Sequence, residues 1–119
     1  MVDDDEEIVG FVTMGLESAG YEVLSALDGE EGLYLARTSR PDLILLDLAM
    51  PRMHGFEVCE AIRSDRDLSG TKIVVTSGKN YAADMKRAKA LGADLYVVKP
   101  YGCQQILDVV GKVLGNGRA

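Results

Sequence analysis

Residues 41–51 read Pro-Asp-Leu-Ile-Leu-Leu-Asp-Leu-Ala-Met-Pro, and this stretch decides the fold. Four consecutive apolar residues, Leu43 to Leu46, lead directly into the carboxylate of Asp47. A short apolar run between two prolines predicts a strand that is buried on both faces, as in a parallel sheet. Asp47 then lies at the carboxyl end of that strand, where open α/β sheets build their sites. Taken alone, such an Asp is as often a turn or cap residue.

Apolar runs and helical patterns alternate along the rest of the chain. Further strands are expected at Tyr21–Ala26, Lys72–Thr76 and Leu95–Val98, together with a leading strand that ends at Val2. A first helix is expected with Asp5, Glu6 and Glu7 in its first turn and its end at Gly20. Further helices are expected at Glu30–Thr38, from His54 or Gly55 to Ser64, at Tyr81–Leu91 and at Cys103–Leu114. This alternation predicts an α/β fold, a parallel sheet with helices on both faces.

Composition excludes several classes of function. The chain has 119 residues, enough for one domain, and a net charge of −6 without any basic stripe, which argues against direct contact with nucleic acid. No apolar run approaches the roughly 18 residues of a membrane span, and the acidic N-terminus is unlike a secretory signal. Cys59 and Cys103 are isolated and predict free thiols. We therefore expect a cytoplasmic protein.

Reactive side chains follow the predicted strands. Crossover connections between parallel strands are right-handed, so every strand delivers its carboxyl end to the same edge of the sheet. The residues that arrive there are Asp3, Asp4, Asp47, Thr76 and Lys99. Three carboxylates within about 5 Å repel by roughly 3 kcal/mol per pair at an effective dielectric constant near 20. Mg²⁺, or Mn²⁺ in its place, is the cation that suits such oxygen ligands.

A cation, an ammonium group and a hydroxyl together form a receptor for a phosphoryl group. Asp47 is then the candidate nucleophile, which would form an aspartyl-phosphate. Other phosphate chemistries fit less well, because the chain has neither G-x-x-x-x-G-K-[ST] nor G-x-G-x-x-G. A phosphatase of the haloacid-dehalogenase type needs a second Asp two positions after the first, where this chain has Ala49.

The whole chain resembles a response-regulator receiver domain of two-component signalling. The motifs that carry the resemblance are Val2–Asp3–Asp4–Asp5, Pro41–Asp42 through Asp47, Met50–Pro51 with Gly55, Val75–Thr76–Ser77 and Val98–Lys99–Pro100. The resemblance implies a flavodoxin-like, doubly wound, five-stranded parallel sheet with strand order 2-1-3-4-5. It also implies a phosphoacceptor signalling domain rather than a true enzyme.

The resemblance assigns a role to each acidic site residue. Asp47 would accept a phosphoryl group from a phosphohistidine on a sensor histidine kinase or a phosphotransfer protein. Asp4, Asp47 and the backbone carbonyl of Ala49 would bind Mg²⁺, with Asp3 helping through water.

The resemblance also implies how the site signals. Lys99 would contact a phosphoryl oxygen and Asp47, and its peptide bond to Pro100 is expected to be cis. Thr76 would swing its hydroxyl onto the phosphoryl group, and Tyr96 would change rotamer behind it. The output surface would be the fourth helix, fifth strand and fifth helix, which would bind a downstream effector or a second copy. In such a dimer the charged residues Lys86, Arg87, Lys89 and Asp108 would pair.

The leading strand departs from the family pattern. It is central in the implied topology, yet only Met1 and Val2 precede Asp3, so about four apolar residues are missing, each worth roughly 1.5–3 kcal/mol when buried. Truncation and strand exchange both remain open at this point. The first strand therefore favours one alternative function, a receiver-like module that binds partners without being phosphorylated. We predict one receiver domain over residues 1–114 and a short flexible tail over 115–119.

Two further residues carry expectations. Tyr101 stands where the family usually has Phe, and its hydroxyl is expected to reach solvent. His54, the only histidine, is expected on an exposed loop outside the chemistry.

Overall fold

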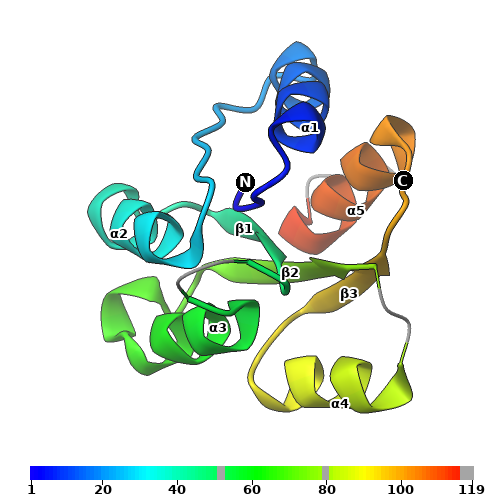
Figure 1. Ribbon diagram of the computed structural model, residues 1–119. Coiled ribbons are helices and arrows are strands. Elements are labelled where there is room, and N and C mark those ends of the chain that lie inside the picture. The colour runs from blue at the N-terminus through cyan, green and yellow to red at the C-terminus, as the bar shows by residue number, and fades with distance from the viewer. Residues whose placement is uncertain (51–52, 79–80, 116–119) are drawn as a thin grey trace.

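The computed structural model describes residues 1–50, 53–78 and 81–115. The motif residue Pro51 and the predicted tail from 116 onward lie outside this part of the chain. Within it, α-helices and parallel strands alternate from α1 to α5, as Figure 1 shows. The elements in chain order are α1 (Glu6–Ser18), α2 (Gly29–Ser39), β1 (Leu43–Asp47), α3 (Gly55–Ser64), the 3-10 helix η1 (Arg66–Leu68), β2 (Lys72–Ser77), α4 (Ala82–Ala90), β3 (Leu95–Val98) and α5 (Cys103–Leu114).

The three strands form a parallel sheet in the order β1-β2-β3. The register places Asp47 opposite Thr76, and Thr76 opposite Val97, two residues before Lys99. The carboxyl ends of all three strands therefore lie at the same edge of the sheet, as the sequence predicts.

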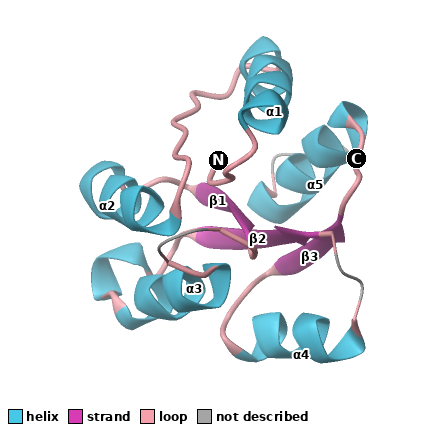
Figure 2. Cartoon of the chain, viewed as in Figure 1, coloured by secondary structure: helices cyan, strands magenta, loops and turns pink. Residues whose placement is uncertain are grey.

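Helices cover both faces of this sheet (Figure 2). One core cluster contains Ile44 and Leu46 of β1 and packs under α2, α3 and α4. The other contains Leu45 and packs under α1 and α5. Successive side chains of β1 thus enter opposite clusters, which explains why its apolar run is continuous.

Of the five predicted strands, the described residues show three as a regular sheet, and the two segments on the far side of β1 contribute only bridges. Val2 makes only isolated parallel bridges, to Ala26 and to Leu46. Residues 21–25 run without regular structure, visible as the irregular connection between α1 and α2 in Figure 1. Among the described residues only Val2 bridges both Ala26 and β1, so residues 21–25 have no neighbouring strand to complete a ladder. The bridges still follow the expected order, with Val2 between Ala26 and β1.

Met1 and Val2 contact the segment before α2 and α2 itself. The Met1 amino group donates a hydrogen bond to the Leu24 carbonyl at 2.9 Å. Its burial lowers the pKa of the amino group to about 6. Val2 packs against Gly32 of α2, where a Cβ atom would come within 2.8 Å of the Val2 side chain. Gly32 is therefore required for α2 to approach Val2 closely.

Side chains at the helix ends account for several polar residues of the sequence. Asp5 accepts backbone hydrogen bonds from Glu7 and Ile8 at the start of α1, which gives it a structural role. His54 is exposed and caps α3 by accepting the Phe56 N–H on Nδ1, so it lies outside the site chemistry, as expected.

Candidate functional site

The site lies at the carboxyl edge of the sheet, and a different segment supplies each side chain. Asp3 follows the Val2 bridge, Asp47 ends β1, Thr76 is the second-last residue of β2 and Lys99 follows β3. The backbone joins two of these segments directly, because the Leu48 N–H donates to the Thr76 carbonyl at 3.0 Å. The sequence therefore brings together residues that are up to 96 positions apart (99 minus 3).

Lys99 pairs with two buried carboxylates. Its Nζ lies 2.9 Å from Asp3 Oδ2 and 3.3 Å from Asp47 Oδ1. The side chains of Asp3 and Asp47 are 1% and 5% exposed, and that of Lys99 is 19% exposed. The predicted contact between Lys99 and Asp47 is present, whereas the shorter contact to Asp3 was not expected from the sequence.

A third carboxylate completes an acidic cluster. One oxygen from each of Asp3, Asp4 and Asp47 lies within 4.8 Å of the others. Asp3 Oδ1 accepts the Asp5 N–H at 2.9 Å, and apart from Lys99 no partner within the described residues reaches Asp3 Oδ2. Two carboxylates are buried and one, Asp4, is open to solvent. This donor set fits a hard divalent cation with room for water ligands.

The electrostatics of the cluster are unbalanced. Burial and the charge of Asp3 raise the pKa of Asp47 to about 6, although Lys99 and the Ala49 backbone act in the opposite direction. Burial alone would lower the pKa of Lys99, but its contacts with the two carboxylates raise the pKa above its usual value. Asp3 and Asp47 share one ammonium group and Asp4 adds a third carboxylate, so the cluster holds an excess of negative charge.

The remaining predicted site residues lie around this cluster. Thr76 is 2% exposed and lies level with Asp47 in the sheet register. Tyr96 is half-buried in β3 and packs against the core beneath α2, α3 and α4. Ala49 is exposed, and its backbone N–H donates a hydrogen bond to the Asp47 carboxylate. The Lys99–Pro100 peptide bond is cis.

The prediction for Tyr101 is wrong. Its hydroxyl is buried and has no hydrogen-bond partner within the described part of the chain. Burial, followed by the charge of Asp3, raises the pKa of Tyr101 to about 12. The ring packs with α1 and α5, so the segment after Pro100 turns inward rather than toward water. The apolar stripe of the following helix was the one sequence signal for this burial.

Comparison with known proteins identifies the family. Residues 1–111 match the family model described as "Response regulator receiver domain". The chain belongs to this family. It is the receiver domain of a two-component response regulator, with an acidic Asp cluster at the phosphorylation site. A receiver domain is a phosphoacceptor signalling module rather than a true enzyme, and it implies a partner histidine kinase.

Individual relatives agree with this assignment. The receiver domain is 39% identical over 106 residues to the alkaline phosphatase synthesis transcriptional regulatory protein PhoP of Bacillus subtilis (strain 168), covering 89% of this chain and 43% of that protein. The chain thus spans less than half the length of this curated relative.

Solved structures show the same fold. The chemotaxis protein CheY4 of Vibrio cholerae has a TM-score of 0.89 at 36% identity, covering 94% of this chain and 93% of that one. A CheY-like receiver domain of Methanospirillum hungatei JF-1 has a TM-score of 0.90 at 31% identity, covering 96% and 90%. None of the helices described here is both long and apolar enough to span a bilayer.

Proposed function

We propose that Asp47 is the residue that accepts the phosphoryl group, from a phosphohistidine of a sensor histidine kinase or phosphotransfer protein. The observation that supports this most is the position of Asp47, which ends β1 with Lys99 Nζ 3.3 Å from its Oδ1 and with the other two acids alongside. Among the described residues, Asp47 is the one acid that lies at the end of a β-strand and also contacts the Lys99 ammonium group.

The transfer moves one phosphoryl group between two side chains. A carboxylate oxygen of Asp47 attacks the phosphorus atom, and the bond between phosphorus and the imidazole nitrogen breaks. The electron pair of that bond stays on the nitrogen. Lys99 stabilises the negative charge on the phosphoryl oxygens as the group moves.

We also propose that Mg²⁺, or Mn²⁺ in its place, binds to Asp3, Asp4, Asp47 and the backbone carbonyl of Ala49. The excess of negative charge and the all-oxygen donor set support this assignment. When bound, the ion neutralises charge on the carboxylates and on the phosphoryl oxygens. Asp3 would act through water, since its Oδ2 is already paired with Lys99.

The signal is proposed to leave the site through Thr76 and Tyr96. A phosphoryl group on Asp47 favours the arrangement in which the Thr76 hydroxyl reaches it, and this shifts an existing equilibrium. Tyr96 then changes rotamer beside α4. The exposed basic residues Lys86, Arg87 and Lys89 of α4 and the exposed Asp108 of α5 support an output surface that binds an effector or a second copy.

The wider setting is proposed from the same features. One receiver domain spans residues 1–114 with the strand order 2-1-3-4-5, and the parallel bridges of Val2 to Ala26 and to Leu46 support this order. The free thiols of Cys59 and Cys103 fit a cytoplasmic location. The acidic composition fits partners that are proteins, without direct contact to nucleic acid or membrane.

Intact mass spectrometry after incubation with phosphoramidate and Mg²⁺ tests the phosphoacceptor. The wild-type chain should gain the mass of one phosphoryl group, and Asp47→Asn should gain none. Asp42→Asn is the matched control, since Asp42 is an exposed acid at the other end of the same strand, and it should behave as wild type. Equal labelling of all three proteins would overturn the assignment.

A second function is favoured by one observation. Val2 holds Asp3 through isolated bridges instead of a regular strand, which is consistent with a module that binds partners without being phosphorylated. The same experiment separates the two, because such a module gains no mass while its fold, followed by circular dichroism, stays intact.

A further inference from the structure

The helix α4 is buried unevenly along its length. Over the described helix, Ala82–Ala90, the buried residue is Ala88, which is 1% exposed and lies in the last turn. Ala82 and Ala83 of the first turn are exposed. In Figure 1, α4 is the yellow-green helix that leads into β3. The end of α4 that leads into β3 is therefore the end that packs against the core.

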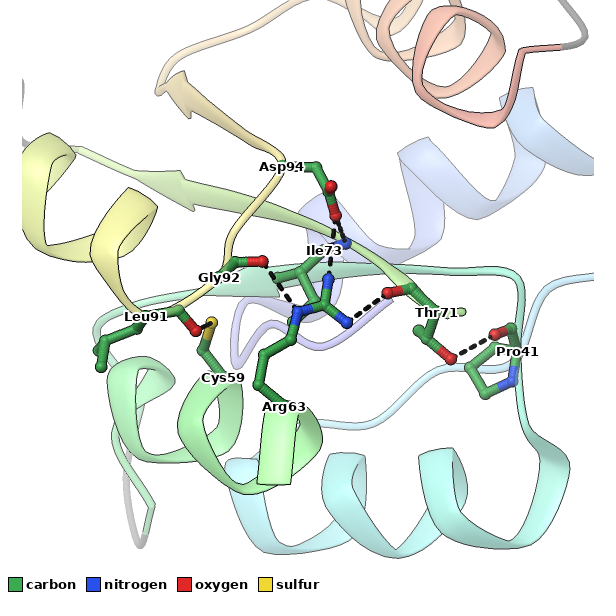
Figure 3. A network of polar contacts seen from close by, with 8 residues as sticks. All are labelled: Pro41, Cys59, Arg63, Thr71, Ile73, Leu91, Gly92 and Asp94. Carbon is green, nitrogen blue, oxygen red and sulfur yellow. Dashed lines mark hydrogen bonds and ion pairs between the residues drawn. The ribbon is translucent and has the colours of Figure 1, made fainter. Parts of the chain in front are cut away.

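Two side chains of α3 hold this carboxyl end of α4. The Cys59 thiol donates to the Leu91 carbonyl at 3.4 Å, and Arg63 Nε donates to the Gly92 carbonyl at 2.9 Å (Figure 3). Gly92 has a φ of +100°, and a Cβ atom at this residue would lie 2.7 Å from Arg63 Cγ. The turn after α4 therefore needs glycine both for its left-handed backbone and for the close approach of Arg63.

The same arginine ties this turn to the sheet. Arg63 also donates to the Thr71 carbonyl at 2.7 Å and to Asp94 Oδ2 at 3.0 Å. Asp94 in turn accepts the Ile73 N–H at 2.8 Å and donates its own N–H to the Ile73 carbonyl at 2.7 Å. Residues 91–94 are thus fixed by hydrogen bonds to α3 and to the start of β2. We call these contacts the Arg63 network.

The rest of α4 is held less firmly. The Arg87 guanidinium lies 4.9 Å from the centre of the Phe56 ring of α3. Among the residues that the structure describes, no hydrogen bond or ion pair joins the side chains of residues 82–86 to another helix or strand. A cation–π contact of an exposed arginine is weaker than a set of charge-assisted hydrogen bonds. The helix is therefore fixed at one end and loosely held at the other.

The loosely held end of α4 is the one nearer in sequence to the phosphorylation site. Thr76 lies level with Asp47 in the sheet register, and α4 begins at Ala82, six residues later (82 minus 76). Because β2 and β3 are parallel, α4 returns the chain to the opposite edge of the sheet, where the Arg63 network lies. A displacement that starts at Thr76 therefore reaches the loosely held end first.

We propose that α4 pivots about residues 91–94, which the Arg63 network holds in place, and that only its amino-terminal part moves when Asp47 is phosphorylated. The motion rests on the proposed function, since phosphorylation of Asp47 starts it through Thr76. Hinges are a few residues at the ends of elements, and Gly92 lies at such an end. Arg63 is a positioning residue, because it holds the pivot and does not touch the phosphoryl group.

Residue-resolved amide hydrogen exchange in the unphosphorylated chain tests the fixed end. The N–H groups of Met85, Leu91, Gly92 and Ala93 all donate to backbone carbonyls of the same segment. The protection factors of the last three should nevertheless exceed that of Met85 at least tenfold, because opening the carboxyl end of α4 also breaks the Arg63 network.

Two arginine variants separate the pivot from a general loss of stability. Arg63→Met should reduce this difference in protection to within about twofold, in a chain that circular dichroism shows to be folded. Arg40→Met is the matched control, since Arg40 pairs with Asp67 at 3.4 Å in an exposed contact of α2. It should keep the wild-type difference.

Nuclear magnetic resonance of the chain kept in phosphoramidate and Mg²⁺ tests the motion. In wild type, phosphorylation should change the amide chemical shifts of residues 82–86 at least threefold more than those of residues 91–94. In Arg63→Met the changes at the two ends should become equal, while intact mass shows labelling at the wild-type rate. A purely stabilising role of Arg63 would leave the ratio of the two changes as in wild type.

Two results in the wild-type chain would overturn the pivot. The first is equal protection of Met85 and residues 91–93 without phosphorylation. The second is a chemical-shift change at residues 91–94 as large as that at residues 82–86, in a chain that intact mass shows to be phosphorylated. A chain that gains no mass would instead overturn the phosphoacceptor assignment, and the exchange comparison would still decide whether Arg63 fixes the end of α4.

Discussion

Two charged networks lie at opposite ends of the three-stranded sheet, and they are balanced differently. At the amino-terminal end, Arg63 donates from Nε to the Gly92 carbonyl at 2.9 Å, from Nη1 to the Thr71 carbonyl at 2.7 Å and from Nη2 to Asp94 Oδ2 at 3.0 Å (Figure 3). At the carboxyl end, Lys99 shares its single ammonium group among the acids of the phosphorylation site.

The Arg63 network is balanced in charge and has a structural role, whereas the Lys99 network carries excess negative charge and belongs to the functional site. In the Arg63 network one cation meets one carboxylate, and Asp94 Oδ2 also accepts the Ile73 N–H at 2.8 Å. This network joins α3 to the starts of β2 and β3. In the Lys99 network the acids outnumber the cation, and the raised pKa of Asp47 reflects the excess. An unbalanced cluster is costly by itself and is suited to a further cation and a phosphoryl group.

The largest expected effect is on the rate of phosphorylation when the Lys99 ammonium group is removed. Lys99→Met should slow labelling by phosphoramidate by about 100- to 1,000-fold, because one charged donor to the moving phosphoryl group is removed. Time-resolved intact mass measurement gives the rate.

Lys72→Met is the matched control for this change, since Lys72 is an exposed lysine at the other end of the sheet. It should keep the wild-type rate. A Lys99→Met variant that is labelled as fast as Lys72→Met would contradict the role of Lys99.

The next effect is a dependence of stability on pH that belongs to the site alone. The pKa of Asp47 is about 6 in the folded chain, against 3.8 for an unperturbed Asp. The folded state therefore holds a proton that the unfolded state releases, and the free energy of unfolding falls as pH rises from about 4 to 6. The loss is about 3 kcal/mol at 1.36 kcal/mol per unit.

Urea unfolding at several pH values isolates this contribution. The difference in unfolding free energy between Asp47→Asn and wild type should grow in favour of the variant by about 3 kcal/mol between pH 4 and pH 7. A constant difference across this range would show that Asp47 carries no raised pKa.

Removal of the balanced network should affect stability without affecting chemistry. Arg63→Met leaves the Gly92 and Thr71 carbonyls without their donor and Asp94 without its counter-charge, which should lower the unfolding free energy by about 2 kcal/mol. Labelling by phosphoramidate should stay within about twofold of wild type, since the network lies away from the site. Slow labelling of the folded variant would mean that the two networks are coupled.

The smallest effect concerns a basic residue outside both networks. The Arg87 guanidinium of α4 lies 4.9 Å from the centre of the Phe56 ring of α3. Arg87→Gln should lower the unfolding free energy by about 0.5–1 kcal/mol, as expected for a cation–π contact made by an exposed arginine. Lys86→Gln, a neighbouring exposed change, should have less effect. A loss as large as that of Arg63→Met would mean that α4 depends on this contact.

How far the sequence predicts the molecule follows from the range of the interactions involved. The apolar runs of β1, β2 and β3 and the five helices are set by local pattern, and each lies within a few residues of its expected position. The convergence of Asp3, Asp47 and Lys99 follows from parallel topology, which chain order nearly determines.

The failures arise from contacts that no local pattern encodes. Residues 21–26 have the composition of a strand, but among the described residues only the Val2 bridge to Ala26 pairs with them, and no local pattern encodes that. The shorter contact of Lys99 to Asp3 depends on side-chain placement within the cluster. The burial of the Tyr101 hydroxyl depends on how α5 packs against α1.

The central claim is that Asp47 receives the phosphoryl group at a cluster that needs a divalent cation. Borohydride reduction of the phosphoramidate-treated chain, followed by tandem mass spectrometry, locates the modified residue directly. The account predicts conversion at position 47 alone, and only when Mg²⁺ or Mn²⁺ is present during labelling. Modification at another residue, or equal labelling in the presence of a chelator, would contradict it.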